Sequence, residues 1–286
     1  MARAKRHYIP GHVWHITHRC HKREFLLKFP RDRRRWIEWL YQAKKKYSGL
    51  SVLDYMVTSN HIHLLVFDNG GRNVIPDSIK LVAGRTGQEY NIRKNRKGAF
   101  WEDRYHATTV ESNRYLRQYI TYIDLNMVRA GVVENSEQWK FCGYNEIQNP
   151  RKRKGIIDFD RLMELLNFEN YDDLKDAHYK WVDSATQTDH CDKENRWTRS
   201  IAVGSKTFIG KIKESLGFRA QGRKIISTDD TFELREGQTP YGNANKLDSG
   251  NIFLWDQPKC WYFMASFIDF TIGYYGPGPV PNRCFY

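Results

Sequence analysis

Residues 59–66 of this chain of 286 residues read Ser-Asn-His-Ile-His-Leu-Leu-Val. His61 and His63 lie two apart in an apolar, β-branched run, and on a strand that spacing places both imidazoles on one face. The apolar residues that alternate with them then point into a core. Two neighbouring imidazoles form a ready pair of metal ligands. A His-x-His pair alone is a weak signal, because two strand histidines with local hydrogen bonds give the same pattern.

A second segment, residues 113–130, has the pattern of one helix and is followed by a glycine, a natural helix stop. Within it Tyr122 and Asn126 are four residues apart, so they lie on one face about one turn from each other. Tyr119 is near the same face but lies about 10 Å along the helix from Asn126. That distance is too long for an oxygen needed at a metal-bound phosphate. Tyr122 is therefore the candidate nucleophile.

These motifs, in this order and at this separation, resemble those of the HUH single-strand DNA nucleases, which are named for a His-hydrophobic-His sequence. Within that group the chain looks like a single-tyrosine transposase, and most of all like the REP-associated tyrosine transposases, over residues 3–145. The resemblance implies that Tyr122 attacks DNA and leaves a 5′-phosphotyrosyl bond. His61, His63 and Asn126 would hold a divalent metal, and this mixed nitrogen and oxygen set suits Mg²⁺ or Mn²⁺.

The chain departs from the family pattern at three positions. Ser59 stands where the family usually has proline before the histidine motif, and Cys20 stands where it has a glycine after the first strand. Met127 replaces a proline that usually follows the asparagine. Without that proline we expect the catalytic helix to run on by a turn and to aim Arg129 differently.

The order of predicted elements is strand, helix, strand, strand, helix, strand, helix. This order indicates an α+β fold, an antiparallel sheet with helices packed on it. The resemblance implies a ferredoxin-like βαββαβ core, with the histidine strand central and the Tyr122 helix across its histidine face. The strands are expected at 8–20, at 50–58, at the histidine motif and up to Val110, and the helices at 30–47 and 75–93.

Four further histidines precede this core, and none has the spacing of a metal site. They are expected to be strand and surface residues, and they are His12, His15, His18 and His21.

A formal net charge of +13 and a pI of about 9.4 indicate a polyanionic partner, with nucleic acid favoured over a membrane surface. The resemblance narrows this partner to single-stranded DNA with a hairpin, bound by a monomer or a homodimer, and no run of residues is apolar enough for a membrane helix. Solvated charged faces and a core tryptophan are the alternative interpretations of the candidate contacts. The candidate DNA-binding residues are Arg93, Lys94, Arg96, Lys97, Trp101, Arg104, Tyr105, Arg129, Arg219, Arg223 and Lys224.

The composition changes after residue 145, and residues 148–155 read as a polar, basic linker. We therefore predict a catalytic domain over 1–147 and an accessory, mainly helical and DNA-binding region over 148–286. Residues 157–182 look helical, and residues 200–225 hold a short basic helix followed by a basic loop. Five scattered cysteines without a CxxC motif favour a reducing cytoplasm, where the protein would associate with the nucleoid.

Two other functions remain open. A replication or mobilisation nickase would use the same chemistry, although one tyrosine and a small first domain favour the transposase. A non-catalytic DNA- or RNA-binding module is the second alternative, because a sheet of this architecture also binds RNA. Against it stands the complete set of His61, His63, Asn126 and Tyr122.

Overall fold

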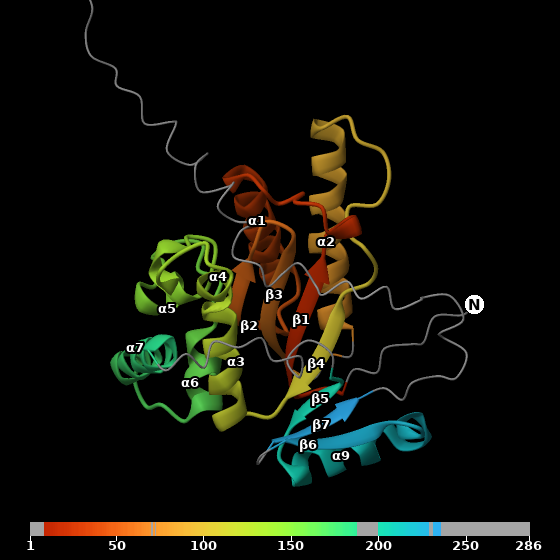
Figure 1. The fold of residues 1–286 in the computed structure, drawn as a ribbon, viewed down its shortest axis with the longest axis vertical. Coiled ribbons are helices and arrows are strands. Elements are labelled where there is room, and N and C mark those ends of the chain that lie inside the picture. Colours follow the sequence, from red (N-terminus) through yellow and green to blue (C-terminus); the bar gives the residue numbers. More distant parts are fainter. Residues whose placement is uncertain (1–8, 70, 72, 188–199, 229–230, 236–286) are drawn as a thin grey trace, which may run out of the picture.

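The computed structural model describes residues 9–69, 71, 73–187, 200–228 and 231–235. Within these residues the chain forms a seven-stranded sheet with the strand order β2-β3-β1-β4-β5-β7-β6 (Figure 1). The first four of these pair antiparallel, and β5 pairs parallel to β4. The strands are β1 Val13–Arg19, β2 Leu50–Val57, β3 His61–Asp68, β4 His106–Val110, β5 Ala202–Gly204, β6 Lys224–Thr228 and β7 Thr231–Arg235.

The helices connect and cover these strands. The α1 and α2 helices are the two crossover helices of the N-terminal half, and they pack side by side. The α3 helix packs against β2, and α6 and α7 pack against α3. The α-helices are α1 Pro30–Lys46, α2 Val74–Arg93, α3 Arg114–Asp124, α4 Asn126–Arg129, α5 Tyr144–Gln148, α6 Phe159–Leu166, α7 Tyr171–Gln187 and α9 Lys206–Leu216, and short 3₁₀ turns lie at His21–Arg23, Ser136–Gln138 and Gly217–Ala220.

The order β2-β3-β1-β4, with α1 and α2 as the crossovers, is the ferredoxin-like βαββαβ arrangement, so this prediction is confirmed. The histidine strand β3 is central, because it lies between β1 and β2. Six of its eight residues are buried, on both faces of the sheet, which explains its continuous apolar sequence. None of the helices among the described residues is long and apolar enough to cross a membrane.

Beyond residue 155 the chain adds two parts to the fold. The helices α6 and α7 lie where helix was predicted over 157–182, although α7 runs on to Gln187, and their apolar side chains join the main core. Residues 200–235 extend the sheet by three strands, which the sequence prediction of a basic helix and loop did not include. The α9 helix and these strands have a small core of their own around Ile209, Ile212 and Leu234.

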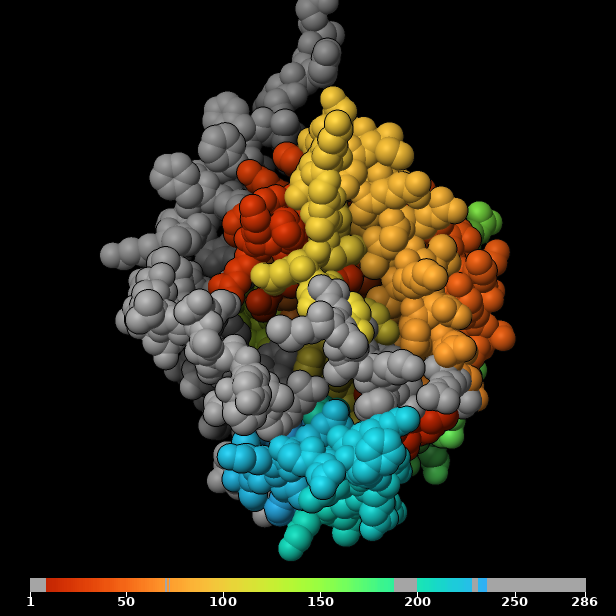
Figure 2. Space-filling model, turned by 90° about the vertical axis from the view of Figure 1, so that its right-hand side faces the viewer, coloured from red at the N-terminus to blue at the C-terminus, as the bar shows by residue number. Residues whose placement is uncertain are grey.

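This last unit is the cyan and blue lobe at one end of the molecule in Figure 2. It is attached along β4, where Thr109 donates its backbone N–H to Ile201 and Glu111 donates to Val203. The Glu111 carboxylate also accepts hydrogen bonds from the backbone and the hydroxyl of Ser205, the residue that caps α9. The aromatic C-terminal tail 261–286 lies outside the described residues.

Candidate active site

The His61 ring lies at the start of β3 and is held by the turn before it. Its Nδ1 is 2.7 Å from the Asn60 side-chain oxygen and 2.9 Å from the Thr58 hydroxyl. The Asn60 amide nitrogen donates to the Arg23 carbonyl, which fixes the orientation of that amide. Because an amide oxygen can only accept, His61 carries its proton on Nδ1. Its Nε2 then holds the lone pair that a metal ion needs.

His63 is buried one pleat further along the same face. Its Nδ1 is 3.0 Å from Nε2 of His15, and its Nε2 is 3.2 Å from the amide nitrogen of Asn126. Burial, reinforced by the neighbouring His61 and His15, keeps the pKa of His63 well below its usual range. His63 is therefore neutral, the form that binds metals.

Tyr122 closes the site from the α3 side. Its ring lies edge-on to that of His63, with 6.0 Å between the ring centres, and the rings of His61 and His63 are 5.0 Å apart. The structure thus brings together the two histidines, the tyrosine and the asparagine that the sequence singled out. Tyr119 is fully buried and packs edge-on against His15 instead.

The expectation of one continuous helix over 113–130 is wrong. The α3 helix ends at Asp124, and α4 begins at Asn126, because Leu125 has a ψ of 2° where an α-helix has about −42°. Arg129 explains how the break is stabilised. Its guanidinium donates to the backbone oxygen of Tyr122 at 2.6 Å and lies 4.3 Å from the centre of the Tyr122 ring.

The lost proline therefore did not lengthen the catalytic helix. The Arg129 guanidinium donates to the Tyr122 carbonyl and lies over the Tyr122 ring. Asn126 starts a new short helix, and its amide nevertheless reaches His63.

The early histidines were expected to be strand and surface residues, and two of them lie on the strand β1 with their side chains buried. His15 is fully buried and His18 is 8% exposed. The register of β1 against β3 would have revealed His15, since this antiparallel pairing places its side chain on the same sheet face as His61 and His63. A single sequence does not reveal that register.

Two of the three candidates around Trp101, the Trp101 and Tyr105 side chains, pack against His18 within the protein. The Trp101 ring stacks on His18 at 4.1 Å between centres, and its nitrogen donates to the Ala83 carbonyl. Tyr105 is buried with its ring edge-on to His18, whereas Arg104 is exposed. Trp101 is half-buried, so part of its surface is accessible to a base.

The basic loop after α2 is partly neutralised. Arg93 pairs with Asp32, and Arg96 pairs with Glu24 at 3.5 Å. Lys94 lies 5.3 Å from the centre of the Phe29 ring, which is 50% exposed, and Lys97 is exposed. This loop offers lysines and an exposed aromatic ring, and its arginines also hold the fold.

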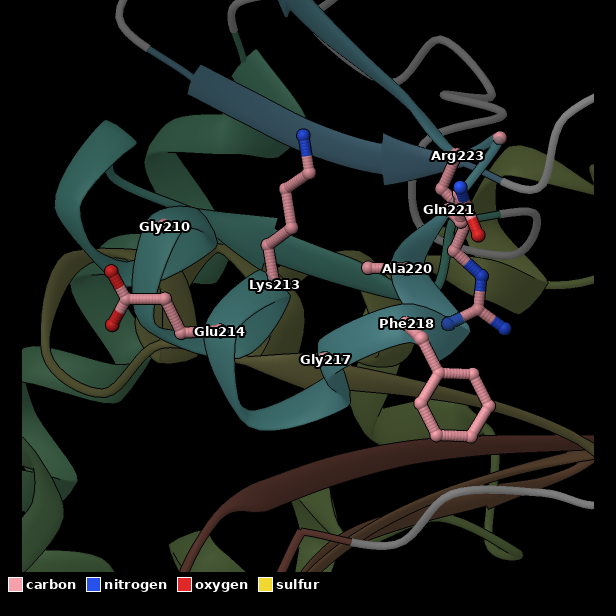
Figure 3. Close-up of a pocket in the computed structure, with 9 residues that line it drawn as sticks. Gly210, Lys213, Glu214, Gly217, Phe218, Ala220, Gln221 and Arg223 are labelled. Atoms are coloured by element: carbon pink, nitrogen blue, oxygen red, sulfur yellow. The ribbon is translucent and has the colours of Figure 1, made fainter.

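The C-terminal candidates line the turn between α9 and β6. Arg223 borders an open hollow of about 610 Å³ together with Phe218 and Lys213. Phe218 is 82% exposed, and the Arg219 guanidinium lies 5.7 Å from its ring centre. In Figure 3 Phe218 and Arg223 extend on the same side of this turn. Lys224 is exposed at the start of β6.

The donor set fits a divalent metal on the histidine face. His61 and His63 both present Nε2 lone pairs. The Asn126 nitrogen faces His63 in this structure, so the amide would have to turn by about 180° to bring its oxygen to a bound metal. Among the described residues no group of three His, Cys, Asp or Glu side chains forms a metal site. The third protein ligand would therefore be the Asn126 oxygen, which favours a hard cation.

Comparison with known proteins finds one family model and solved structures that resemble part of the chain. No curated protein matches the chain. A solved structure of a REP-associated tyrosine transposase bound to a REP hairpin has 18% identity and a TM-score of 0.44, covering 56% of this chain and 95% of its own. A candidate transposase from Deinococcus radiodurans R1 has 18% identity and a TM-score of 0.29, covering 37% and 84%. The family model described as IS200-like transposase matches residues 9–126, which include the histidine motif, Tyr122 and Asn126. Over this segment the chain is similar to the IS200-like transposases.

Proposed function

We propose that this protein is a transposase that cleaves and rejoins single-stranded DNA through Tyr122. The observation that carries the proposal is the convergence of Tyr122 on His61, His63 and Asn126 in one site. Tyrosine is a poor nucleophile near neutral pH, since its reference pKa is about 10. A site of this kind must therefore stabilise both the phenolate and the charge on the phosphate.

The proposed reaction is a balanced transesterification. The Tyr122 oxygen loses its proton and bonds to the phosphorus, and the bond from phosphorus to the 3′-oxygen breaks. The leaving strand takes up a proton and becomes a free 3′-hydroxyl. The number of phosphodiester bonds is conserved in the 5′-phosphotyrosine, so a 3′-hydroxyl can reverse the step on the same or another strand.

The residues of this chain would share the work as follows. A bound Mg²⁺ or Mn²⁺ would supply Lewis-acid stabilisation of the phosphate charge. His61, His63 and Asn126 would hold it, and Arg129 would keep the Tyr122 backbone and ring in place.

We further propose that the substrate is a DNA hairpin with unpaired flanks. A paired strand is held away from a tyrosine on a helix, so the cleaved phosphate must be single-stranded. The exposed Lys94 and Lys97 and the turn that carries Phe218, Arg219 and Arg223 combine positive charge with exposed rings, which suits phosphates and unpaired bases.

The test is incubation of the full chain with hairpin DNA and Mn²⁺, followed by a denaturing gel. We expect a covalent protein–DNA adduct with the wild type and none with Tyr122→Phe, while DNA affinity stays within a few-fold. Tyr119→Phe is the matched control, a buried tyrosine one turn earlier, and should keep the adduct. An adduct that survives Tyr122→Phe but not Tyr119→Phe would reject the assignment.

The same experiment separates the two alternatives. A non-catalytic binding module would bind the hairpin and give no adduct under any metal condition. A nickase would form the adduct and would not join the cleaved end to a second strand with a 3′-hydroxyl.

A further inference from the structure

We infer that His15 is a positioning residue, which holds His63 in the tautomer that presents Nε2 to the metal site. This inference rests on the proposed metal site, although its main test does not require the metal. His15 itself lies on β1 and contacts His63 from the side opposite to Asn126.

The contact between the two imidazoles is an in-line hydrogen bond. Nε2 of His15 and Nδ1 of His63 are 3.0 Å apart, the rings are inclined by 7°, and their centres are 5.2 Å apart. That separation of centres equals the N···N distance plus two ring radii. The rings therefore lie edge to edge in nearly one plane, and the proton points directly at the opposing lone pair.

The direction of the hydrogen bond between His15 and His63 follows from the contact that His63 makes through its other ring nitrogen, Nε2. The Asn126 amide nitrogen can only donate, so Nε2 of His63 is the acceptor at 3.2 Å. A neutral imidazole with a lone pair on Nε2 carries its proton on Nδ1. Nδ1 of His63 therefore donates to His15, and Nε2 of His15 accepts. The same tautomer is the one that a metal ligand requires.

His15 is held firmly enough to impose this choice. It is fully buried, its strand pairs with β3 on one side and β4 on the other, and Tyr119 packs edge-on against its ring at 5.1 Å. Partners of this kind, which bond the distal nitrogen of a metal-ligating histidine, typically change metal affinity 10- to 100-fold when removed.

The test compares His15→Gln with His15→Met. The two side chains have nearly the same length, but only glutamine retains an oxygen that accepts from Nδ1 of His63. His18→Phe is the control, because His18 is buried on the same strand and bonds to the Asp103 carbonyl instead. The nitrogen-15 NMR signals of His63 in the metal-free protein report its tautomer.

We expect His63 to be protonated on Nδ1 in the wild type, in His15→Gln and in His18→Phe. In His15→Met we expect a mixture of tautomers and roughly 10- to 100-fold weaker Mn²⁺ binding by calorimetry. A wild-type His63 protonated on Nε2 would overturn the inference without any variant. So would a His15→Met protein with unchanged tautomer and Mn²⁺ affinity. If the wild type binds no Mn²⁺, the proposed metal site fails, while the tautomer measurement still decides the role of His15.

Discussion

At the scale of single residues, the sequence allowed the site to be assembled from two short motifs. The two-residue period of a strand places His61 and His63 on one face of the sheet. The period of a helix places Tyr122 and Asn126 on one face of a helix. His15 was missed because its place depends on strand register, a long-range property. The aim of Arg129 was missed because it depends on a helix break between residues that each favour a helix.

The metal ligands give the first prediction at this scale. We expect His61→Ala and His63→Ala each to lose Mn²⁺ binding and metal-dependent cleavage, because each removes an imidazole from a three-ligand set. His12→Ala is the control, since His12 hydrogen-bonds to the Pro10 carbonyl and its ring contacts Phe208 rather than the histidine pair. The measurement is calorimetric titration of Mn²⁺ into all four proteins, with circular dichroism to establish folding. Equal binding by all four would remove the metal site.

Arg129 gives the second prediction at this scale. Arg129→Gln removes the bond to the Tyr122 carbonyl and the cation over its ring, so Tyr122 is held less precisely. We expect the cleavage rate to fall roughly 10- to 100-fold. Arg117→Gln is the matched control, an arginine of α3 whose guanidinium lies over Trp181. Single-turnover cleavage kinetics measure the effect, and equal rates for the two variants would contradict it.

At the scale of elements, α3 is held in place by α7, a helix that lies after the domain boundary predicted from the sequence. On α7, His178 lies 2.7 Å from the Asp124 carboxyl, and both are buried. Gln148 donates to the other ring nitrogen of His178, so the histidine donates to Asp124. Burial lowers the pKa of His178 to about 3, and it raises that of Asp124. The brace therefore joins α7 to the last residue of α3 through a neutral imidazole.

This brace can be tested without touching the catalytic residues. His178→Ala leaves a buried Asp124 oxygen without its donor, which costs about 1–3 kcal/mol. Tyr179→Ala, at the next position of α7 but 52% exposed, should cost much less. Urea unfolding at neutral pH measures both variants. If the two cost the same, α7 is not anchored through His178.

At the scale of the whole molecule, element order predicted the antiparallel sheet with helices on it, and the family resemblance implied its βαββαβ core. Neither predicted the extension of the sheet. The β5 strand has three residues, too few for a periodic signal, and its pairing with β4 spans about ninety residues of sequence. The expected domain boundary at residue 147 stays a prediction. In the structure Ile156, Leu162 and Leu174 complete the core formed by the residues before that boundary.

This packing determines which truncated proteins we expect to fold. Removing residues 188–286 keeps α6 and α7 and takes away the lobe with Phe218, Arg219 and Arg223. We expect that protein to fold, to bind hairpins more weakly, and to show a shallower dependence of affinity on salt. Cleavage of short single strands should remain. A cut after residue 147 should instead expose core surface and lose stability.

Fluorescence anisotropy of labelled hairpin DNA over a salt series, with circular dichroism of both truncations, makes these measurements. Hairpin affinity and salt dependence that are unchanged without residues 188–286 would show that the lobe takes no part in DNA binding.

The central claim is that Tyr122 becomes covalently joined to DNA. The most direct measurement is to trap the reaction of the full chain with a single-stranded oligonucleotide and Mn²⁺, digest the protein, and identify the DNA-linked peptide by mass spectrometry. The account predicts a single modified peptide that carries a 5′-phosphate on Tyr122, and a free 3′-hydroxyl on the released strand. A nucleotide linked to Tyr115 or Tyr119, or cleavage that leaves no linked peptide, would contradict it.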